Sequence, residues 1–262
     1  MRLAAYFIVG TSLVPLVLSL LVGFTPSRFL ELPGNTWTLD WYRQVLANPV
    51  WTRALANSFI VAALTTAISI PTALGAAVGL SRGEWRRRSL WETVLLAPLA
   101  LPAVAIAAGL LAIVRPTPLW GSHLGLALAH SVITVPVAYL ALRASLERVD
   151  PTLEAAARGL GATRWQAFRH ITLPLITPGL LAATLFAIVI SLNEVTLTLF
   201  LATRDTSTLP IVIWPHLRFA ISPQAAAASG ILFVVSAPAL AAAAWRLVGR
   251  KAAAKSSVVG VR

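Results

Sequence analysis

One acidic side chain of this chain falls inside an otherwise apolar run. The 262 residues include only nine Asp and Glu, and Glu194, with Asn193 beside it, lies within the run Thr177–Leu201. If this run crosses a membrane, the carboxylate is costly there and normally faces a water-filled cavity or a partner. We therefore expect Glu194 either to line a pathway that attracts a cationic solute or to make a structural contact with an Arg or with backbone donors.

Other residue types that carry catalysis or bind metals form no recognisable site. The sequence has no Cys, and its four His residues share no ligand spacing. No Ser, His and acid combination indicates a catalytic triad. The closest approach to a phosphate-binding loop is Gly249–Ser256, in which Ala254 replaces the second glycine. His130 lies in an apolar run and is interpreted as a packing histidine, with a proton relay as the alternative. We expect no catalytic or metal site and no cofactor bound by this chain.

A long polar segment, Leu146–Ile176, separates two apolar runs and predicts two short helices. It is far longer than the two to eight residues that usually join bundle helices. Asp150 is a good N-cap with Pro151 at the first helical position. Gly161 is expected to end this first helix in a left-handed conformation. One apolar stripe is predicted along it, formed by Leu153, Ala156, Ala157 and Leu160.

The second short helix is expected to begin at Thr163 and to end at Pro174. Thr163 and Gln166 have the spacing of a capping box. The apolar face of this helix is predicted to consist of Trp165, Phe168 and Ile171. The two helices form a helix–turn–helix elbow held by its apolar side, and the alternative is a surface helix that rests on lipid headgroups.

The elements that position these residues are predicted to be membrane helices. Apolar types make up 58% of the chain and charged types 11%, whereas a soluble domain has about 25% charged residues. A chain so poor in charge is neither a soluble domain nor a disordered one. The net charge of +12 is not a sign of nucleic-acid binding, because the basic residues lie mostly in short gaps between apolar runs.

Six apolar runs are long enough to cross a membrane as helices, which takes about 20 residues each. The first follows Arg2, as a signal peptide would, but it is longer than a usual signal core and lacks an Ala-x-Ala pattern after it, so we expect a retained anchor. The six predicted spans are Leu3–Phe24, Ala54–Leu80, Leu90–Val114, Leu124–Leu142, Thr177–Leu201 and Ala225–Val248.

The loops between these spans predict the orientation of the chain. With both termini inside, 15 of the 21 basic residues lie on the inner side and 6 on the outer side, which is the positive-inside asymmetry. Glu92 then lies near the cytoplasmic end of the third span, where the headgroups can solvate it. The outer segment Ala202–Gln224 mixes apolar and turn residues, which is typical of a short re-entrant or interfacial helix.

The end of the elbow resembles the conserved cytoplasmic loop of ABC importer permeases. The family pattern is Glu-Ala-Ala, three residues, Gly, nine residues and Ile-x-Leu-Pro. Gly161 is followed after nine residues by Ile171, Leu173 and Pro174, which match the pattern in type and spacing.

The start of that pattern is shifted in this chain. Its glutamate position falls on Ala155, followed by Ala156, whereas the acidic residue is Glu154, one place earlier. The resemblance extends to Ala56-Asn57-Ser58, which is similar to the Asn-Ser signature that opens the type-1 transmembrane domain. Ser191–Val195 and Thr208–Pro210 resemble the spermidine/putrescine branch, although branches for aminoethylphosphonate or ferric iron share much of this pattern.

The resemblance implies an all-α integral membrane protein of six transmembrane helices with a cytoplasmic coupling-helix elbow between the fourth and fifth. It implies a first helix and outer segment over 1–53, a transmembrane domain over 54–248 with its coupling loop at 146–176, and a cytoplasmic tail over 249–262. Asn193 and Glu194 are the expected pathway residues. The expected ATPase-coupling residues are Glu154, Ala155, Ala156, Gly161, Ile171, Leu173 and Pro174.

The same resemblance implies a set of partners and a location. They are a dimer of ATPase subunits that binds the ATP, a second permease chain that is usually a different one, and an extracytoplasmic solute-binding protein. The location is the bacterial inner membrane, with both termini cytoplasmic. Two alternatives are an ion-gradient-driven transporter, which usually shows internal repeats that are not evident here, and a non-transporting scaffold, in which Glu194 and the elbow would have no purpose.

Topology can be tested because the chain has no cysteine of its own. We expect the single variants Arg86→Cys, Arg164→Cys and Lys255→Cys to resist an impermeant thiol reagent in intact cells and to react after lysis. The reason is the excess of basic residues on the inner side. Labelling of all three variants from outside would contradict the predicted orientation.

Overall fold

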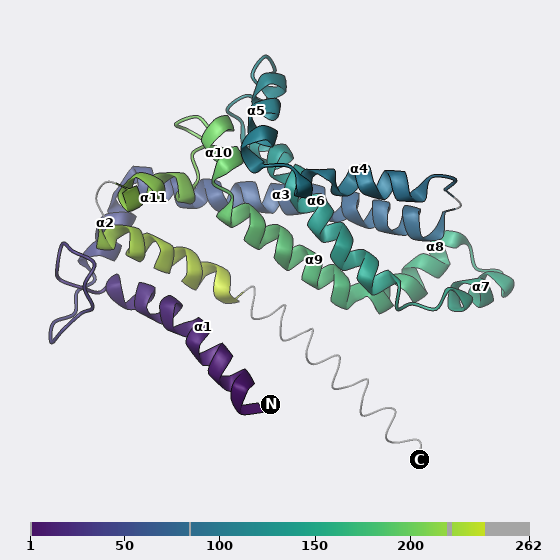
Figure 1. Ribbon diagram of the computed structural model, residues 1–262, viewed down its shortest axis with the longest axis horizontal. Helices are drawn as coiled ribbons and strands as arrows, with labels where there is room; N and C mark the ends of the chain where they lie inside the picture. Colours follow the sequence, from purple (N-terminus) through teal and green to yellow (C-terminus); the bar gives the residue numbers. More distant parts are fainter. Residues whose placement is uncertain (1, 84, 219–221, 239–262) are drawn as a thin grey trace. The chain divides into compact units, whose positions relative to one another are not determined.

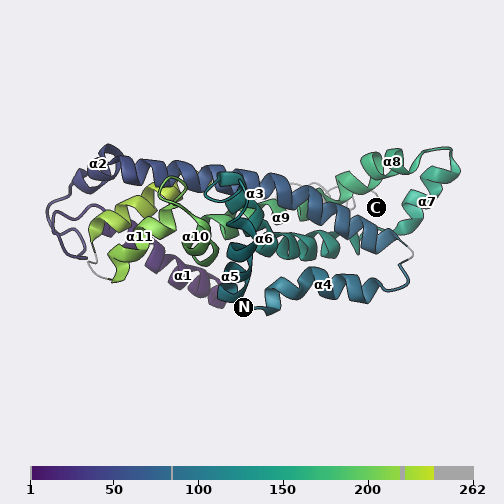
Figure 2. The ribbon, with the colours of Figure 1, turned by 90° about the horizontal axis from the view of Figure 1, so that it is seen from above.

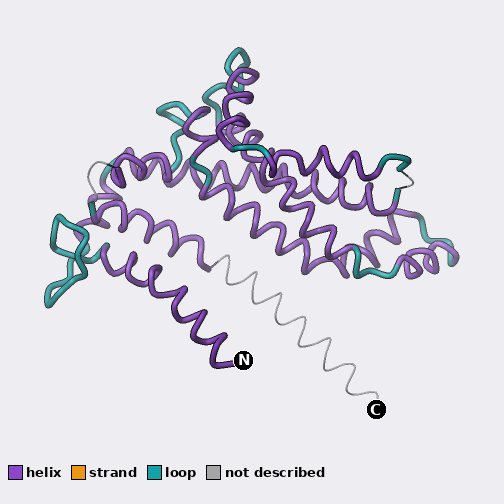
Figure 3. Tube along the Cα trace, viewed as in Figure 1, coloured by secondary structure: helices purple, strands orange, loops and turns teal. Residues whose placement is uncertain are grey.

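The computed structural model describes residues 2–83, 85–218 and 222–238. Every regular element in these ranges is a helix, as Figure 3 shows, so the all-α prediction is confirmed for them. The sixth predicted span is described only as the helix Pro223–Pro238. The rest of that span and the predicted tail, including the near-match at Gly249–Ser256, lie outside the described residues.

Three helices in the described ranges are long and apolar enough to cross a membrane. They are α3 (Pro49–Arg82), α6 (His123–Leu146) and the continuous helical stretch Arg164–Asn193. A fourth span results if α4 (Arg88–Ala100) and α5 (Ala103–Val114) are counted together. A count of six spans stays a prediction.

The third predicted span, Leu90–Val114, is not one continuous helix but a bent pair of helices. Its two halves, α4 and α5, meet at an angle of 103° (Figure 1). At the break Leu101 is extended, with φ −92° and ψ 144°, and Pro102 follows it. The cause is the proline ring, which disfavours helical geometry in the preceding residue and supplies no N–H.

The fifth predicted span, Thr177–Leu201, is also interrupted. Helix α9 runs over Leu173–Asn193, and the short helix α10 over Thr196–Leu201 follows it. Between them Glu194 is extended, with φ −75° and ψ 113°. Most residues on either side of the break are apolar, so average hydropathy does not reveal it.

Pro174 does not end the helix before it, contrary to the prediction. Helix α8 (Arg164–Ala167) passes through a π-helical turn, η1 (Phe168–Thr172), directly into α9, where Pro174 lies in the first turn. The N–H of Leu173 donates to the carbonyl of Phe168, five residues back. Such a local change of hydrogen-bond register satisfies backbone groups around a proline, so the helix continues through it.

The described part of the chain divides into two compact units, one formed by residues of the ranges 2–58 and 204–238 and the other by residues of the range 59–203. In the first unit, α2 (Asp40–Ala47) and α11 (Leu209–Arg218) share an apolar core with the helix Pro223–Pro238. Helix α11 confirms that the outer segment Ala202–Gln224 contains a short helix. Helix α1 (Arg2–Val22) also belongs to this unit.

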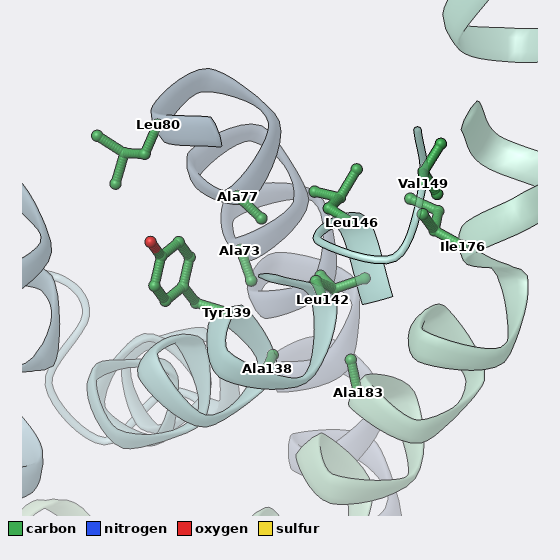
Figure 4. Close-up of a cluster of buried hydrophobic side chains, with 10 residues drawn as sticks. All are labelled: Ala73, Ala77, Leu80, Ala138, Tyr139, Leu142, Leu146, Val149, Ile176 and Ala183. Carbon is green, nitrogen blue, oxygen red and sulfur yellow. The ribbon is translucent and has the colours of Figure 1, made fainter. Parts of the chain in front are cut away.

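In the second unit, α6 and α9 lie side by side along their length, as Figures 1 and 2 both show. Figure 4 shows the core that forms where α3, α6 and α9 meet. Small residues of α3 face larger ones of α6, which allows the helices to approach closely. This core comprises Ala73, Ala77, Leu80, Ala138, Tyr139, Leu142, Leu146, Val149, Ile176 and Ala183.

Glu92 on α4 is not solvated as predicted, because its side chain is bound by residues of the same unit and is 16% exposed. One carboxylate oxygen accepts hydrogen bonds from Arg88 Nε and from the Tyr139 hydroxyl, both at 3.0 Å. The other oxygen accepts from Arg143 Nη1 at 2.9 Å. These bonds join α4 to α6, so a residue expected to face headgroups instead fixes two helices.

The contact between α6 and α9 depends on Gly179. A Cβ at this position would lie 2.3 Å from Ser145 Cβ and 3.3 Å from the Ala141 carbonyl oxygen. We expect Gly179→Ala to lower the free energy of unfolding by about 1–3 kcal/mol, because a packed interface has no room for the methyl group. Thermal unfolding in mild detergent measures this loss.

The matched control is Gly75→Ala on α3, where a Cβ would meet nothing within 4 Å. That variant should be neutral or slightly stabilising, since alanine is the better helix former. Equal destabilisation by both variants would contradict the close approach at Gly179.

Candidate functional site

The first helix of the elbow, α7 (Pro151–Gly159), begins at the predicted cap. The Asp150 carboxylate accepts a hydrogen bond from the Thr152 backbone N–H at 2.9 Å, and Pro151 occupies the first helical position. The pKa of Asp150 is lowered, first by this backbone hydrogen bond and further by the Thr152 side chain. The local sequence alone is therefore sufficient to start the helix at this residue.

The turn between the two helices of the elbow is set by Gly161 and Thr163. Gly161 has φ +93°, in the left-handed region expected for it. Its N–H donates to the Arg158 carbonyl at 3.0 Å. Thr163 caps α8 through a complete capping box: its hydroxyl accepts from the Gln166 N–H, and the Gln166 side chain accepts from the Thr163 N–H. Both caps predicted from the sequence are confirmed.

The apolar face of the elbow is exposed, whereas the sequence predicted that it holds the elbow in place. No residue of α7 is buried. Leu160 is 91% exposed and Trp165 is 64% exposed, with the Trp165 ring stacked on Phe168 at 5.6 Å between centroids. As Figures 1 and 2 show, α7 lies at the end of the second unit, beyond the ends of α6 and α9. The elbow thus offers an apolar surface that no segment in the described part of the chain covers.

A polar contact, and not the apolar stripe, connects α7 to the rest of its unit. Glu154 Oε1 lies 3.3 Å from Arg82 Nη2 at the end of α3. The hydroxyl of Thr172, in the π turn, donates a hydrogen bond to the same oxygen. Arg82 Nη2 also donates to the Val149 carbonyl at 3.4 Å. Glu154 therefore joins three segments that are distant in the sequence.

Glu194 lies at the break between α9 and α10 and caps the second of these helices. Its Oε1 accepts a hydrogen bond from the Leu197 backbone N–H at 2.9 Å, and its carbonyl accepts from the Thr198 hydroxyl at 3.0 Å. Within the described ranges its carboxylate takes part in no ion pair. The neighbouring Asn193 is exposed, and its side-chain amide donates to the Val189 carbonyl. The sequence left open a structural contact of Glu194 with an Arg or with backbone donors, and the contact observed is with a backbone donor.

A buried histidine connects both sides of that break. His130 on α6 is 1% exposed, with Nδ1 at 2.9 Å from the Ser191 hydroxyl on α9 and Nε2 at 3.0 Å from the Thr198 hydroxyl on α10. Ser191 Oγ is also 3.4 Å from Thr65 Oγ1 on α3. Both ring nitrogens have hydrogen-bond partners, as expected for a packing histidine.

Two motifs recognised separately in the sequence come together in the first unit. The Asn57 side-chain amide donates to the carbonyls of Asp205 and Ser207 at 2.8 and 2.9 Å. The Ser58 hydroxyl accepts from the Leu209 backbone N–H at 2.8 Å. The Asn-Ser pair therefore fixes the segment that leads into α11.

The predicted site residues form two groups at opposite ends of α9. The coupling-loop residues lie in the elbow and at the start of α9, whereas Asn193 ends α9 and Glu194 follows it, about 30 Å away at 1.5 Å per residue. Sequence reasoning did not find Arg82, Thr172 or Thr198 as partners. Thr172 and Thr198 are polar residues at buried positions of an apolar chain, and that signal was available. No group of residues able to hold a metal ion occurs in the described ranges.

The sequence of this chain is similar to those of known transport proteins. The family described as binding-protein-dependent transport system inner membrane component matches residues 69–252. The trehalose transport system permease protein SugB of Mycobacterium tuberculosis is 30% identical over 210 residues, covering 79% of this chain and 77% of SugB. The putrescine transport system permease protein PotI of Escherichia coli is 28% identical over 219 residues, covering 80% of this chain and 77% of PotI.

The fold is similar to that of a solved transporter as well. A chain of the bacterial alginate ABC transporter, solved in complex with an alginate pentasaccharide-bound periplasmic protein, superposes with a TM-score of 0.65 at 17% sequence identity. The match covers 92% of this chain and 94% of that one. At this identity the likeness concerns the fold alone.

The contacts of His130 generate a stability prediction. We expect His130→Leu to lower the free energy of unfolding by about 1–3 kcal/mol, because the hydroxyls of Ser191 and Thr198 lose their buried partner. His130→Gln, which keeps a donor and an acceptor, should lose less. Thermal unfolding of both variants in detergent checks this order, and equal stability of the leucine variant and the wild type would refute the role of the histidine.

Proposed function

Since this chain belongs to the family of binding-protein-dependent transport system inner membrane components and is an ABC importer permease, we propose that it transports a polyamine-type cation and is driven through its elbow by a separate ATPase. Six membrane spans, cytoplasmic termini and an inner-membrane location belong to this proposal. Membership of this family sets the ion-gradient transporter and the scaffold aside.

The exposed elbow supports the coupling part of the proposal. A coupling element must offer a surface to another subunit and transmit force without deforming. Within the described residues the apolar face of the α7–α8 elbow is largely exposed, and caps at Asp150, Gly161 and Thr163 define its two helices. Glu154, Ala155, Ala156, Gly161, Ile171, Leu173 and Pro174 are the proposed coupling residues.

Glu194 supports the cationic cargo and is the single observation that carries it. The carboxylate lies at a helix break inside an apolar run, next to an exposed Asn193, and no ion pair in the described part of the chain neutralises it. A carboxylate so placed attracts positive charge along a pathway. The similarity to a putrescine permease agrees with this reading, whereas the similarity to a trehalose permease favours a neutral sugar as the second candidate.

The proposed assembly contains a second permease chain, two ATPase subunits and an extracytoplasmic solute-binding protein. The solved transporter with a similar fold is in complex with a periplasmic protein. ATP would be bound by the ATPase subunits, and this chain would be the non-catalytic membrane subunit. Purification in mild detergent followed by mass spectrometry tests the assembly, and the absence of a stoichiometric ATPase would contradict it.

Gly161→Val tests the coupling role of the elbow. A β-branched residue at φ +93° should cost more than about 1 kcal/mol and redirect α8 relative to α7. We expect the variant to insert in the membrane but to lose solute uptake and to recover less ATPase on purification.

Gly159→Val is the matched control, two residues away in the same exposed turn. Gly159 lies in α7, and a Cβ there would meet nothing within 4 Å. It should retain uptake. Wild-type uptake and ATPase recovery by Gly161→Val would refute the coupling assignment.

Substitutions at Glu194 separate charge from helix capping. Glu194→Gln keeps an oxygen that can accept from the Leu197 N–H but removes the charge, whereas Glu194→Leu removes both. If the cargo is a polyamine, Glu194→Gln should weaken putrescine uptake by roughly tenfold while thermal stability stays at the wild-type value. Glu194→Leu should lower both uptake and stability.

The cargo is read from the same experiment. Wild-type putrescine uptake by Glu194→Gln would show that the carboxylate serves only as a cap. Uptake of trehalose, and not of putrescine, by the wild-type chain would establish the second candidate.

A further inference from the structure

The glutamate of the elbow points toward its own chain. Glu154 Oε1 is shared by Arg82 Nη2 and the Thr172 hydroxyl, and the two charged side chains are only 22–23% exposed. Arg82 is itself largely enclosed. Its Nε atom is buried and has no hydrogen-bond partner. Glu154 is the carboxylate paired with Arg82, and the charge of Asp150 also lies close enough to interact with Arg82.

The next residue, Ala155, faces a different direction from Glu154. In an α-helix one residue corresponds to a rotation of about 100°, so neighbouring side chains face different directions. Ala155, where the family pattern has its glutamate, is exposed on α7, and so is Ala156. The shift of the acid by one residue thus moves the charge from the outer face of α7 to the face that meets α3 and the π turn.

This inward contact is the ion pair that joins α7 to α3. None of the residues of α7 is buried. Its N-terminal end is also connected to Arg82, since Arg82 Nη2 donates to the Val149 carbonyl just before the helix. Arg82 and Glu154 together therefore determine the direction in which α7 leaves its unit.

We infer that Glu154 is a positioning residue, which fixes the orientation of the elbow through Arg82 and Thr172 and leaves the exposed face of α7 without an acidic side chain. We call the contact of Glu154 with Arg82 and Thr172 the latch. The effect of the latch on coupling rests on the proposed function, but the latch itself is a property of the isolated chain. The surface of the ATPase that meets α7 then needs no cation opposite position 155. Arg158 is the charged residue that α7 presents to it.

The latch can be measured by distances between spin labels on the full-length chain, which has no native cysteine. Thr72→Cys on α3 and Leu160→Cys at the end of α7 place labels at exposed positions of the same unit. We expect one narrow distance distribution in the otherwise unchanged chain. Glu154→Gln should disfavour this orientation by about fivefold, at the upper end for a partly exposed ion pair, and a second population should appear.

Two further variants give the control and the rescue. Glu147→Gln removes another carboxylate of the same surface, which is paired with Arg143 Nε at 2.8 Å, and should leave the distribution unchanged. Arg82→Glu combined with Glu154→Arg should restore the narrow distribution that either single change abolishes. A purely structural role of Glu154 would lower thermal stability and not be rescued by the reversed pair.

The outcomes divide clearly. A distribution unchanged by Glu154→Gln, or equally changed by Glu147→Gln, would overturn the latch. Failure of the unsubstituted chain to recover an ATPase would instead overturn the proposed function and leave the latch standing. If both hold, Glu154→Gln should reduce ATPase recovery, and the reversed pair should return it.

Discussion

The structure depends on one constraint: an apolar chain in lipid must satisfy the backbone groups at every helix break from its own residues. Ser122 accepts from the Gly125 N–H at the start of α6, and Glu194 does the same for Leu197 in α10. Ser58 reaches across the first unit to the Leu209 N–H. At the sharp bend between α4 and α5, Pro102 meets the constraint differently, because it has no N–H to satisfy. Several polar residues of this chain are therefore used where a helix begins.

This constraint explains which parts of the fold could be predicted. Both ends of α7 and the start of α8 were predicted correctly because Asp150, Gly161, Thr163 and Gln166 act on groups within three residues. The break in the fifth predicted span was missed, because apolar windows average over one extended residue. Pro174 was read as a stop by a rule that holds for regular α-helices, and the π turn before it removes the conflict.

The candidate sites show the same division between local and distant information. The sequence placed Glu194 in an apolar run and recognised Asn57-Ser58 and Thr208–Pro210 as separate motifs. It could not pair residues more than 60 positions apart, such as His130 with Ser191, or Asn57 with Ser207. It also could not tell that the displaced glutamate faces Arg82, because that depends on how α7 leaves the end of α6. The local sequence specifies the helix caps, whereas helix packing determines which side chains from different helices become hydrogen-bond partners.

Nine residues separate Gly161 from Ile171, and the π turn at the end of this interval sets the angle of the elbow about the axis of α9. A π turn holds one residue more than an α turn, so it changes the phase of everything before it relative to α9. A deletion of one residue here could convert the turn to α-helix without shortening the chain enough to break it. The elbow would then rotate by about 100° around the axis of α9, and its apolar face would point to a different side. The number of residues in this interval thus determines the angle of the elbow about the axis of α9.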